Sequence, residues 1–383
     1  MKKKFLFVTS SRADYGPAKN LIKLFKKKSK NFKLLVTGSH LNKKFGRSEQ
    51  EIIEDGIIPD FKIDILKKSN LNNMNKISEI TFKEFNFFFQ NRYKPDILII
   101  LGDRFEMLPI VYSAFLANIR VAHINGGEIT HGSIDDSIRH SITKLSNYHF
   151  VSTKRNKNRL IRLGEDPKNV MNFGYLGVEN INNIGFLSKD ELEKKLKIFF
   201  NKKNLILVFH PETFVSLKKN IKNIKIIIKT LKTLKNFNIF ITASNFDFGG
   251  QKFNYYLEKQ SKKIKNFYFF KSLGKKSFLS LLKKSDGIIG NSSSGIIEAP
   301  SLKKATINLG LRQHGRSKNK NIINSRITKK DIIKSINQIF LKKFKNKLIK
   351  NNNEYEQKNT SKKIFDFLNK LKNETNNQKI FYE

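Results

Sequence analysis

The chain has 383 residues and no cysteine, which excludes disulfide bonds, thiol nucleophiles and cysteine-based zinc sites. The chain is longer than a typical single domain and fits two domains of about 100 to 200 residues each. The formal net charge of +43 comes from lysines spread along expected helices, without the interleaved arginines and aromatics of nucleic-acid readers, so we expect no nucleic-acid partner.

The first residues give no sign of export or of a membrane anchor. Lysines follow Met1, and then only about five apolar residues precede Ser10, fewer than the roughly 7 to 15 of a signal-peptide core. No apolar run further along approaches the roughly 20 residues that a membrane-spanning helix requires. We therefore expect a soluble, cytoplasmic protein without a membrane partner.

The first half of the chain alternates short apolar runs with amphipathic segments, which is typical of βα units and a parallel sheet. The expected strands are residues 4–9, 32–37, 97–101, 120–123 and 148–151. The expected helices are residues 17–28, 106–117 and 135–144. These elements predict one doubly wound α/β domain.

The second half repeats this pattern after a polar break near residues 180–200. A charged helix is expected at 188–197, followed by strands at 205–209, 238–242, 267–270, 287–289 and 305–309 and helices at 275–284 and 295–299. We therefore expect an N-terminal domain over 1–185 and a C-terminal domain over 186–350. Residues 351–383 are expected to form a helix at 362–371 and a polar tail with a frayed end.

A polar turn follows the first strand and opens the first helix. It reads Ser-Ser-Arg-Ala-Asp-Tyr-Gly-Pro at 10–17. In open α/β sheets ligands bind at the carboxyl ends of strands, and helix N-termini attract phosphate. Arg12 is therefore a candidate phosphate contact, although an ordinary βα turn with a surface arginine fits the same residues. His40 follows the second strand and is a weaker candidate of the same kind.

A serine-rich segment, Gly-Asn-Ser-Ser-Ser-Gly-Ile-Ile-Glu at 290–298, joins an expected strand to an expected helix. Its glycines let backbone amides approach an anion, and its hydroxyls add donors without negative charge, although the Gly-Lys-Ser/Thr ending of a P-loop is missing. Glu298 suits either a ribose hydroxyl pair or a helix cap. The predicted diphosphate contacts are Ser292, Ser293, Ser294 and Gly295.

Acidic side chains gather at the carboxyl ends of two strands that we expect to be neighbours. Asp103 follows one strand and Glu128 follows the next. The helix that begins at Asp135 adds a third carboxylate and, on the same face, Arg139. Neighbouring carboxylates split each other's pKa values into an acid and a base, which suits proton transfer. The spacings match no recognised metal-binding motif, so we expect no metal.

The second domain offers a smaller set of candidates. His210 ends its first strand, at a position where doubly wound domains place ligand contacts. Arg312 and Arg316 follow its last strand and add cationic donors near the serine-rich segment. His149, by contrast, lies in an apolar strand and is expected to be a core residue.

Together these motifs resemble the UDP-N-acetylglucosamine 2-epimerase family, and in particular its hydrolysing branch. The segments similar to that branch are Gly-Asp-Arg-Phe-Glu-Met-Leu at 102–108, Gly-Gly-Glu-Ile-Thr at 126–130 and Asp-Asp-Ser-Ile-Arg-His-Ser-Ile-Thr-Lys at 135–144. The resemblance implies the GT-B architecture, with two Rossmann-like doubly wound domains around a central cleft. It also implies a UDP-sugar substrate, no cofactor and a homodimer.

The resemblance further implies roles for individual residues. Asp103 and Asp135 match carboxylates that act at C2 and at the leaving group, and His210 matches a histidine of the second domain. Where some relatives carry a catalytic glutamate this chain has Asn125, so either Glu128 supplies the carboxylate or fewer acids suffice. The implied nucleotide contacts are Arg12, Ser293, Ser294, Gly295 and Glu298. The possible substrate contacts are His40, Asn125, Arg139, Arg312 and Arg316.

The implied reaction eliminates UDP to give a glycal and then adds water. Its product is free N-acetylmannosamine or a 2,4-diacetamido analogue, a precursor of sialic acids and related nonulosonates. Three alternatives stay open from the sequence: a non-hydrolysing 2-epimerase, a GT-B glycosyltransferase and a basic RNA-binding protein. The last would leave the acids at the strand ends unexplained.

Overall fold

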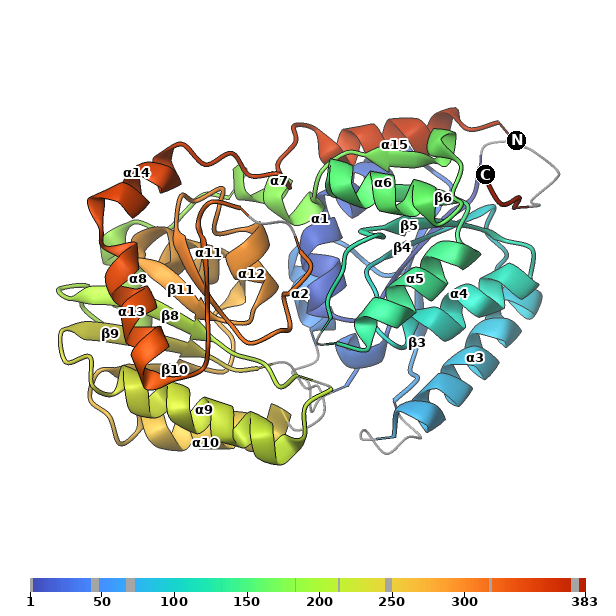
Figure 1. The fold of residues 1–383 in the computed structure, drawn as a ribbon. Helices are drawn as coiled ribbons and strands as arrows, with labels where there is room; N and C mark the ends of the chain where they lie inside the picture. Colours follow the sequence, from blue (N-terminus) through green and yellow to red (C-terminus); the bar gives the residue numbers. More distant parts are fainter. Residues whose placement is uncertain are drawn as a thin grey trace. The chain divides into compact units, whose positions relative to one another are not determined.

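The computed structural model describes residues 3–42, 48–66, 73–131, 133–182, 184–212, 214–244, 250–316, 319–372 and 379–383. The chain forms two compact units, each built from a parallel sheet with interleaved helices (Figure 1). The first unit comprises Met1–Glu128, Asp135–Asn180 and Gln357–Glu383. The second comprises Ile129–Ile134 and Ile181–Glu356.

The sheet of the first unit has seven parallel strands in the order β3-β2-β1-β4-β5-β6-β7. The strand order reverses between β1 and β4, which is where doubly wound sheets bind ligands at the strands' carboxyl ends. The strands are β1 (Phe5–Thr9), β2 (Phe32–Thr37), β3 (Phe61–Ile63), β4 (Ile97–Leu101), β5 (Arg120–Ile124), β6 (Tyr148–Val151) and β7 (Val170–Asn172).

Helices cover both faces of this sheet, because successive side chains of a strand point to opposite faces. Phe5 and Phe7 of β1 pack with apolar residues of α1 and α15, whereas Leu6 and Val8 pack with α3 and α4. The helices are α1 (Arg12–Lys28), α2 (Glu49–Glu54), α3 (Met74–Asn91), α4 (Met107–Leu116), α5 (Asp135–Leu145), α6 (Lys154–Arg162), α7 (Leu176–Asn182) and α15 (Thr360–Lys370), with 3₁₀ turns at Gly38–His40 and Pro167–Asn169.

The second unit has six parallel strands in the order β10-β9-β8-β11-β12-β13. Leu205 and Leu207 of β8 pack with α9, α10 and α13, and Ile206 and Val208 pack with α8 and α11 on the other face. The strands are β8 (Lys203–Val208), β9 (Phe237–Thr242), β10 (Phe267–Phe270), β11 (Gly287–Gly290), β12 (Ala305–Leu309) and β13 (Ile322–Ser325). The helices are α8 (Lys189–Leu196), α9 (Leu217–Leu231), α10 (Gly250–Ser261), α11 (Gly274–Lys284), α12 (Ser293–Ile297), α13 (Lys329–Ile339) and α14 (Lys342–Ile349).

After crossing the second unit, the chain returns to the first, where α15 lies beside α1 (Figure 1). Phe365 packs against Phe25 of α1 with ring centroids 4.9 Å apart. Ser361 donates its backbone N–H to Glu179 Oε2 at 3.0 Å. Beyond α15, the Tyr382 N–H donates to the Gly164 carbonyl at 3.0 Å. The backbone of Tyr382 therefore contacts the rest of the first unit, although the side chains of residues 380–382 are exposed.

The expected α/β class with two doubly wound sheets is confirmed, with differences at the helix ends. Helix α1 begins at Arg12 rather than residue 17, because Ser11 caps it by accepting the Ala13 N–H. Several helices were not predicted from the sequence, among them α3 and α9, which are 18 and 15 residues long. Within the described ranges, no helix is long and apolar enough to cross a bilayer.

Candidate active site

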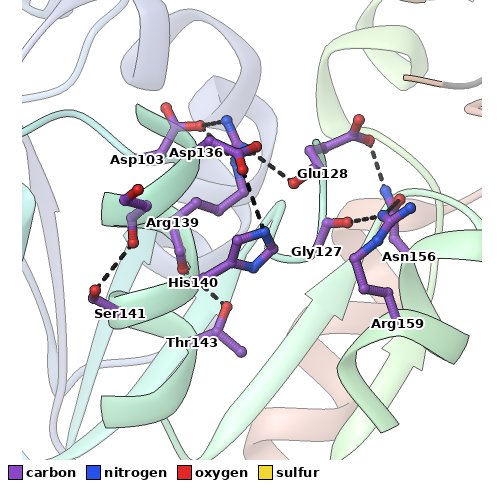
Figure 2. Close-up of polar contacts among 11 residues, drawn as sticks. Asp103, Gly127, Glu128, Asp136, Arg139, His140, Ser141, Thr143, Asn156 and Arg159 are labelled. Atoms are coloured by element: carbon purple, nitrogen blue, oxygen red, sulfur yellow. Dashed lines mark hydrogen bonds and ion pairs between the residues drawn. The ribbon is translucent and has the colours of Figure 1, made fainter. Parts of the chain in front are cut away.

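Arg139 organises the carboxylates at the β4 and β5 edge of the first unit (Figure 2). Its side chain is 1% exposed, and its Nε donates to Asp103 Oδ2 at 2.7 Å. A second guanidinium nitrogen contacts the same oxygen, and a third donates to the Glu128 carbonyl at 2.8 Å and to Asp136 Oδ1 at 3.2 Å. Because the guanidinium fork is rigid, these contacts fix the orientation of Asp103. The Asp103 side chain stays 24% exposed, so a substrate can reach it.

Helix α6 holds the Glu128 carboxylate. Asn156 donates its amide to Glu128 Oε1 at 2.6 Å, and Arg159 donates to the Gly127 carbonyl (Figure 2). Glu128 is buried, and Gly127 adopts a φ of 76°. A Cβ on Gly127 would lie 2.4 Å from a methyl group of Leu160 and 3.0 Å from the Asn156 carbonyl oxygen, so glycine is favoured where the chain passes α6. Asn156 and Arg159 were not identified from the sequence.

Asn125 has a conformation that suits asparagine better than glutamate. Its φ is 68°, in the left-handed region that asparagine tolerates best among residues other than glycine. Its side-chain oxygen accepts a hydrogen bond from Ser152 at 2.9 Å, and its backbone N–H donates to the Phe150 carbonyl at 2.8 Å. Asn125 therefore shapes the turn after β5 and brings no carboxylate, which leaves Glu128 as the acid of this turn.

Asp14 orders the turn after β1. Its carboxylate accepts hydrogen bonds from the Ser10 N–H at 2.6 Å and the Thr9 hydroxyl at 2.9 Å, and from the Ser11 hydroxyl. Burial raises the pKa of Asp14, although these hydrogen bonds oppose the shift. The hydroxyl of Ser10 donates in turn to Glu106 Oε1 at 2.8 Å, which links this turn to the segment after β4.

Arg12 is the first residue of α1 rather than part of a turn before it. Its guanidinium pairs with Glu51 at 2.7 Å, and both side chains are more than 40% exposed. Exposed ion pairs of this kind contribute about 0–1 kcal/mol, so an anionic ligand can displace Glu51 at low cost. The position therefore suits a phosphate contact.

Two histidines of the first unit are enclosed. His40 Nε2 lies 3.0 Å from the Thr9 hydroxyl, and its Nδ1 lies 2.8 Å from the Ser48 hydroxyl. His123 Nε2 donates to the Gly102 carbonyl at 2.8 Å. Burial lowers the pKa of each to about 3, so both are neutral at physiological pH. His40 thus braces the turns after β1 and β2, with both ring nitrogens engaged inside the protein.

The serine-rich segment of the second unit forms the turn from β11 into α12. Gly290 has a φ of 134°, and a Cβ there would lie 1.9 Å from the Val208 carbonyl oxygen. Gly295 lets α12 lie against β12, since a Cβ would come within 2.6 Å of Thr306. Ser292 caps the helix by accepting the Ser294 N–H at 3.3 Å. Ser293 and Ser294 form the first turn of α12 and, like Ser292, are partly exposed.

Asn291 ties this segment to the end of β8. It accepts the His210 N–H at 2.7 Å and donates to the His210 carbonyl at 2.8 Å, so the pairing is reciprocal. Arg312 donates to the Asn291 carbonyl at 3.4 Å, and Glu212 accepts the Arg312 N–H at 3.0 Å. Burial and the nearby Arg312 lower the pKa of His210 to about 3. His210, Arg312 and the serine-rich segment therefore meet at one edge, as the sequence predicted.

The carboxylate of Glu298 has an unused acceptor. Glu298 caps the end of α12, and its Oε2 is buried without a hydrogen-bond partner among the described residues. Burial raises the pKa of Glu298, while Lys275 and Arg316 oppose the shift. A buried acceptor without a donor costs about 1–3 kcal/mol, so this oxygen suits a ligand hydroxyl. Glu298 follows the last residue of α12, so it is not the cap at the start of the helix that the sequence offered as an alternative; Ser292 holds that position.

Most of the predicted residues thus lie in two groups, whereas Arg12 and His40 lie after β1 and β2. One group, in the first unit, gathers Asp103, Glu128, Asp135 and Arg139 at the β4–β5 edge, and the other, in the second unit, gathers His210, Arg312, Glu298 and the three serines. Arg316 lies in the same loop as Arg312, and its positive charge favours the ionised form of Glu298 and so opposes the rise in the pKa of that carboxyl. Within the described ranges, no three His, Asp or Glu side chains are grouped as metal ligands.

Comparisons with known proteins give the family and the fold of the chain. Residues 23–369 match the family model described as UDP-N-acetylglucosamine 2-epimerase. The chain is 39% identical to "GDP/UDP-N,N'-diacetylbacillosamine 2-epimerase (hydrolyzing)" of Campylobacter jejuni, over 90% of this chain and 89% of that protein. It is 36% identical to "Polysialic acid biosynthesis protein P7" of Escherichia coli, over 88% and 85%.

The fold is also that of solved structures. The crystal structure of UDP-GlcNAc 2-epimerase from Neisseria meningitidis bound to UDP-GlcNAc matches with a TM-score of 0.82 at 21% identity, covering 95% of this chain and 99% of that one. The Methanocaldococcus jannaschii UDP-GlcNAc 2-epimerase matches with a TM-score of 0.78 at 20% identity, covering 95% and 99%. From the family match over most of its length and from its relatives, this chain belongs to the UDP-N-acetylglucosamine 2-epimerase family.

Proposed function

We propose that the protein is a hydrolysing UDP-sugar 2-epimerase. A base removes the proton from C2 while the bond between C1 and the UDP oxygen breaks, which gives UDP and a glycal. Water then adds across the double bond, with its hydroxyl at C1 and a proton at C2 on the opposite face. The sum is UDP-sugar plus water to UDP plus the free 2-epimerised sugar, with no net oxidation or reduction.

The orientation of Asp103 by Arg139 is the observation that carries this proposal. The C2 proton is weakly acidic, so a base must be held in place before the substrate arrives. Asp103 meets this requirement, because a buried guanidinium holds one of its oxygens while the side chain remains partly exposed. Glu128, held by Asn156, and Asp135, at the start of α5, supply the further carboxylates that the elimination and the hydration need.

Residues of the second unit are proposed to bind the nucleotide. The partly exposed start of α12 offers backbone N–H groups and hydroxyls to the diphosphate, and Arg312 and Arg316 add positive charge. The partnerless Glu298 oxygen suits a ribose hydroxyl. His210 is neutral, so it can donate or accept a hydrogen bond at the sugar without adding charge. Arg12 is the proposed anion contact of the first unit.

The proposed substrate class is a UDP-linked 2-acetamido sugar, and a 2,4-diacetamido sugar is the first to test. Two relatives, from Campylobacter jejuni and Legionella pneumophila, are named as hydrolysing epimerases of diacetylbacillosamine nucleotides, at 39% and 32% identity. A relative from Neisseria meningitidis named "UDP-N-acetylglucosamine 2-epimerase", at 31% identity, supports UDP-N-acetylglucosamine as the second candidate. The released sugar would serve nonulosonate synthesis in the cytoplasm.

The test is an NMR time course in D₂O with each of these two nucleotides. We expect the phosphorus signals of free UDP to appear together with a free 2-epimerised sugar that carries deuterium at C2. A product that is still linked to UDP would instead identify a non-hydrolysing epimerase. Release of UDP without loss of the C2 proton would contradict elimination, and no change with either nucleotide would contradict the proposed substrate class.

A further inference from the structure

Lys379 caps the C-terminal end of α5, the helix that carries Asp135 and Arg139. Its Nζ donates to the carbonyls of Thr143 at 3.0 Å, Lys144 at 3.0 Å and Ser146 at 2.7 Å. The last carbonyls of a helix have no partner within the helix, and a positive charge there is favourable. Only 22% of the Lys379 side chain is exposed. One side chain from the end of the chain thus satisfies three carbonyls around the end of α5.

A buried carboxylate anchors this lysine. Glu165 is 1% exposed, and its Oε2 lies 2.5 Å from Lys379 Nζ and 2.8 Å from His149 Nε2. Lys144 pairs with its other oxygen at 2.9 Å. Although burial opposes the shift, the contacts with His149 and Lys379 lower the pKa of Glu165 to about 2. The carboxylate therefore keeps its charge at physiological pH and compensates the buried charge of Lys379, while the three carbonyls hold the Lys379 ammonium in place.

The residues around Lys379 dock as well. The Tyr382 N–H donates to the Gly164 carbonyl at 3.0 Å, and the ring of Phe381 lies so close to Gly164 that a Cβ there would come within 2.2 Å of it. Lys144 Nζ lies 5.0 Å from the centre of the Phe381 ring. Lys379, the Phe381 ring and the Tyr382 backbone thus contact the rest of the first unit together, although the side chains of residues 380–382 stay exposed.

A continuous set of contacts joins this cap to Asp103. The Thr143 hydroxyl donates to the Arg139 carbonyl at 3.0 Å and lies 3.4 Å from His123 Nδ1. His123 Nε2 donates to the carbonyl of Gly102, the residue before Asp103, at 2.8 Å. Arg139 itself donates to Asp103. A shift at the end of α5 would therefore reach Asp103 by two routes, through Arg139 and through His123.

We propose that Lys379 is a positioning residue of the 2-epimerase, which fixes α5 and thereby the place of Asp103. The kinetic test of this proposal rests on the proposed function, whereas the NMR signals of His123 test it independently of turnover. Lys379 contacts the end of α5 and Glu165 rather than the proposed catalytic residues, so its loss acts on kcat through the orientation of Asp103. The affinity for the nucleotide, whose proposed contacts lie mostly in the second unit, stays the same.

Three variants separate the carbonyl cap from the ion pair: Lys379→Met, Glu165→Gln, and both together. Lys379→Met removes the cap and leaves a buried carboxylate with one cation fewer, whereas Glu165→Gln keeps all three carbonyl contacts and serves as the matched control. The double variant lacks the cap and also lacks the buried charge, so it guards against misfolding of the single lysine variant. We expect kcat to fall at least fivefold in Lys379→Met and in the double variant, with KM within twofold of wild type. We expect Glu165→Gln to stay within twofold of wild type.

The ring ¹⁵N and ¹H NMR signals of His123 give the second readout. We expect them to shift in both variants that lack Lys379 and to stay in place in Glu165→Gln. Equal losses of kcat in Lys379→Met and Glu165→Gln would overturn the proposal in favour of the ion pair alone. Unchanged kcat with an unchanged His123 signal in the folded double variant would overturn it altogether. If the wild type turns over no sugar nucleotide, the proposed function fails, and the His123 signals alone decide whether Lys379 positions this edge.

Discussion

Replacement of Arg139 by methionine tests how the catalytic edge of the first unit is held. The guanidinium is 1% exposed and donates to oxygens of Asp103, Asp136 and the Glu128 main chain. Methionine fills a similar volume beside α5 but donates no hydrogen bond. The substitution therefore removes the orienting contacts without adding charge or bulk.

The loss of stability follows from the hydrogen bonds that each acceptor oxygen of Arg139 loses. The Glu128 carbonyl loses a buried charged donor, which costs about 1–2 kcal/mol. The Asp103 and Asp136 side chains are 24% and 27% exposed, so water replaces part of the contact and each adds about 0.5–1 kcal/mol. The sum, about 2–4 kcal/mol, predicts a Tm that is lower by roughly 5–15 °C for a unit of this size.

The loss of activity should be larger than the loss of stability suggests. A reacting group displaced by about 1 Å can lose about 100-fold in rate, and Asp103 loses both donors that orient it. We expect kcat for UDP release to fall about 100-fold in Arg139→Met, measured below its Tm, with Kd for UDP within threefold by calorimetry. The exposed Arg162 of α6 gives the control Arg162→Met, which should match wild type. A kcat within threefold of wild type, together with the expected fall in Tm, would refute the role of Arg139 in orienting Asp103.

Three further predictions follow from the same structure. Asp103→Asn should abolish UDP release, by phosphorus NMR, while UDP binding persists; unchanged turnover would remove this carboxylate from the mechanism. Gly290→Ala should destabilise the protein by about 3 kcal/mol, because a Cβ meets the Val208 oxygen at a φ of 134°; the control Gly185→Ala, with open space around it, should not. Burial lowers the pKa of three histidines to about 3, so each binds fewer protons in the folded than in the unfolded protein near pH 5. Their contribution to the free energy of unfolding is therefore complete above about pH 6.5 and is lost as the pH falls toward 3. The loss is up to about 1.4 kcal/mol per pH unit for each histidine. A Tm that stays flat from pH 7 to pH 5 would contradict this. The histidines concerned are His40, His123 and His210.

The strands were the part of the fold that the sequence predicted best. Expected strands at 97–101 and 148–151 coincide with β4 and β6, because a parallel sheet covered on both faces requires continuous apolar runs that stand out from polar surroundings. Helix α9 was missed although Ile224, Ile227 and Leu231 lie on one buried face. Lysine and isoleucine are frequent both in this segment and in the rest of the chain, so its composition did not mark it as a helix. Only the helical spacing of its apolar residues indicated one.

The acids of the site were predictable and the residues that hold them were not. Asp103 and Glu128 follow strands, and strand ends can be read from the chain. Asn156 and Asn291 work through contacts with partners 28 and 81 residues away, and asparagine is so common in this chain that neither stands out. His40 shows the converse limit: its place after a strand suggested a ligand contact, while the folded chain engages both its ring nitrogens.

The return of α15 to the first unit bears on how the protein is made. Ile364, Phe365 and Leu368 belong to the core that β1 and α1 begin to build at the other end of the chain. On the ribosome, the second unit can therefore close its own core before the first unit has received its last helix. Until α15 emerges, Phe5, Phe25 and their neighbours lack part of their cover, which leaves apolar surface open to chaperones and to aggregation. A chain interrupted near residue 350 would then lose the first unit, the one that carries the proposed chemistry, and would spare much of the second.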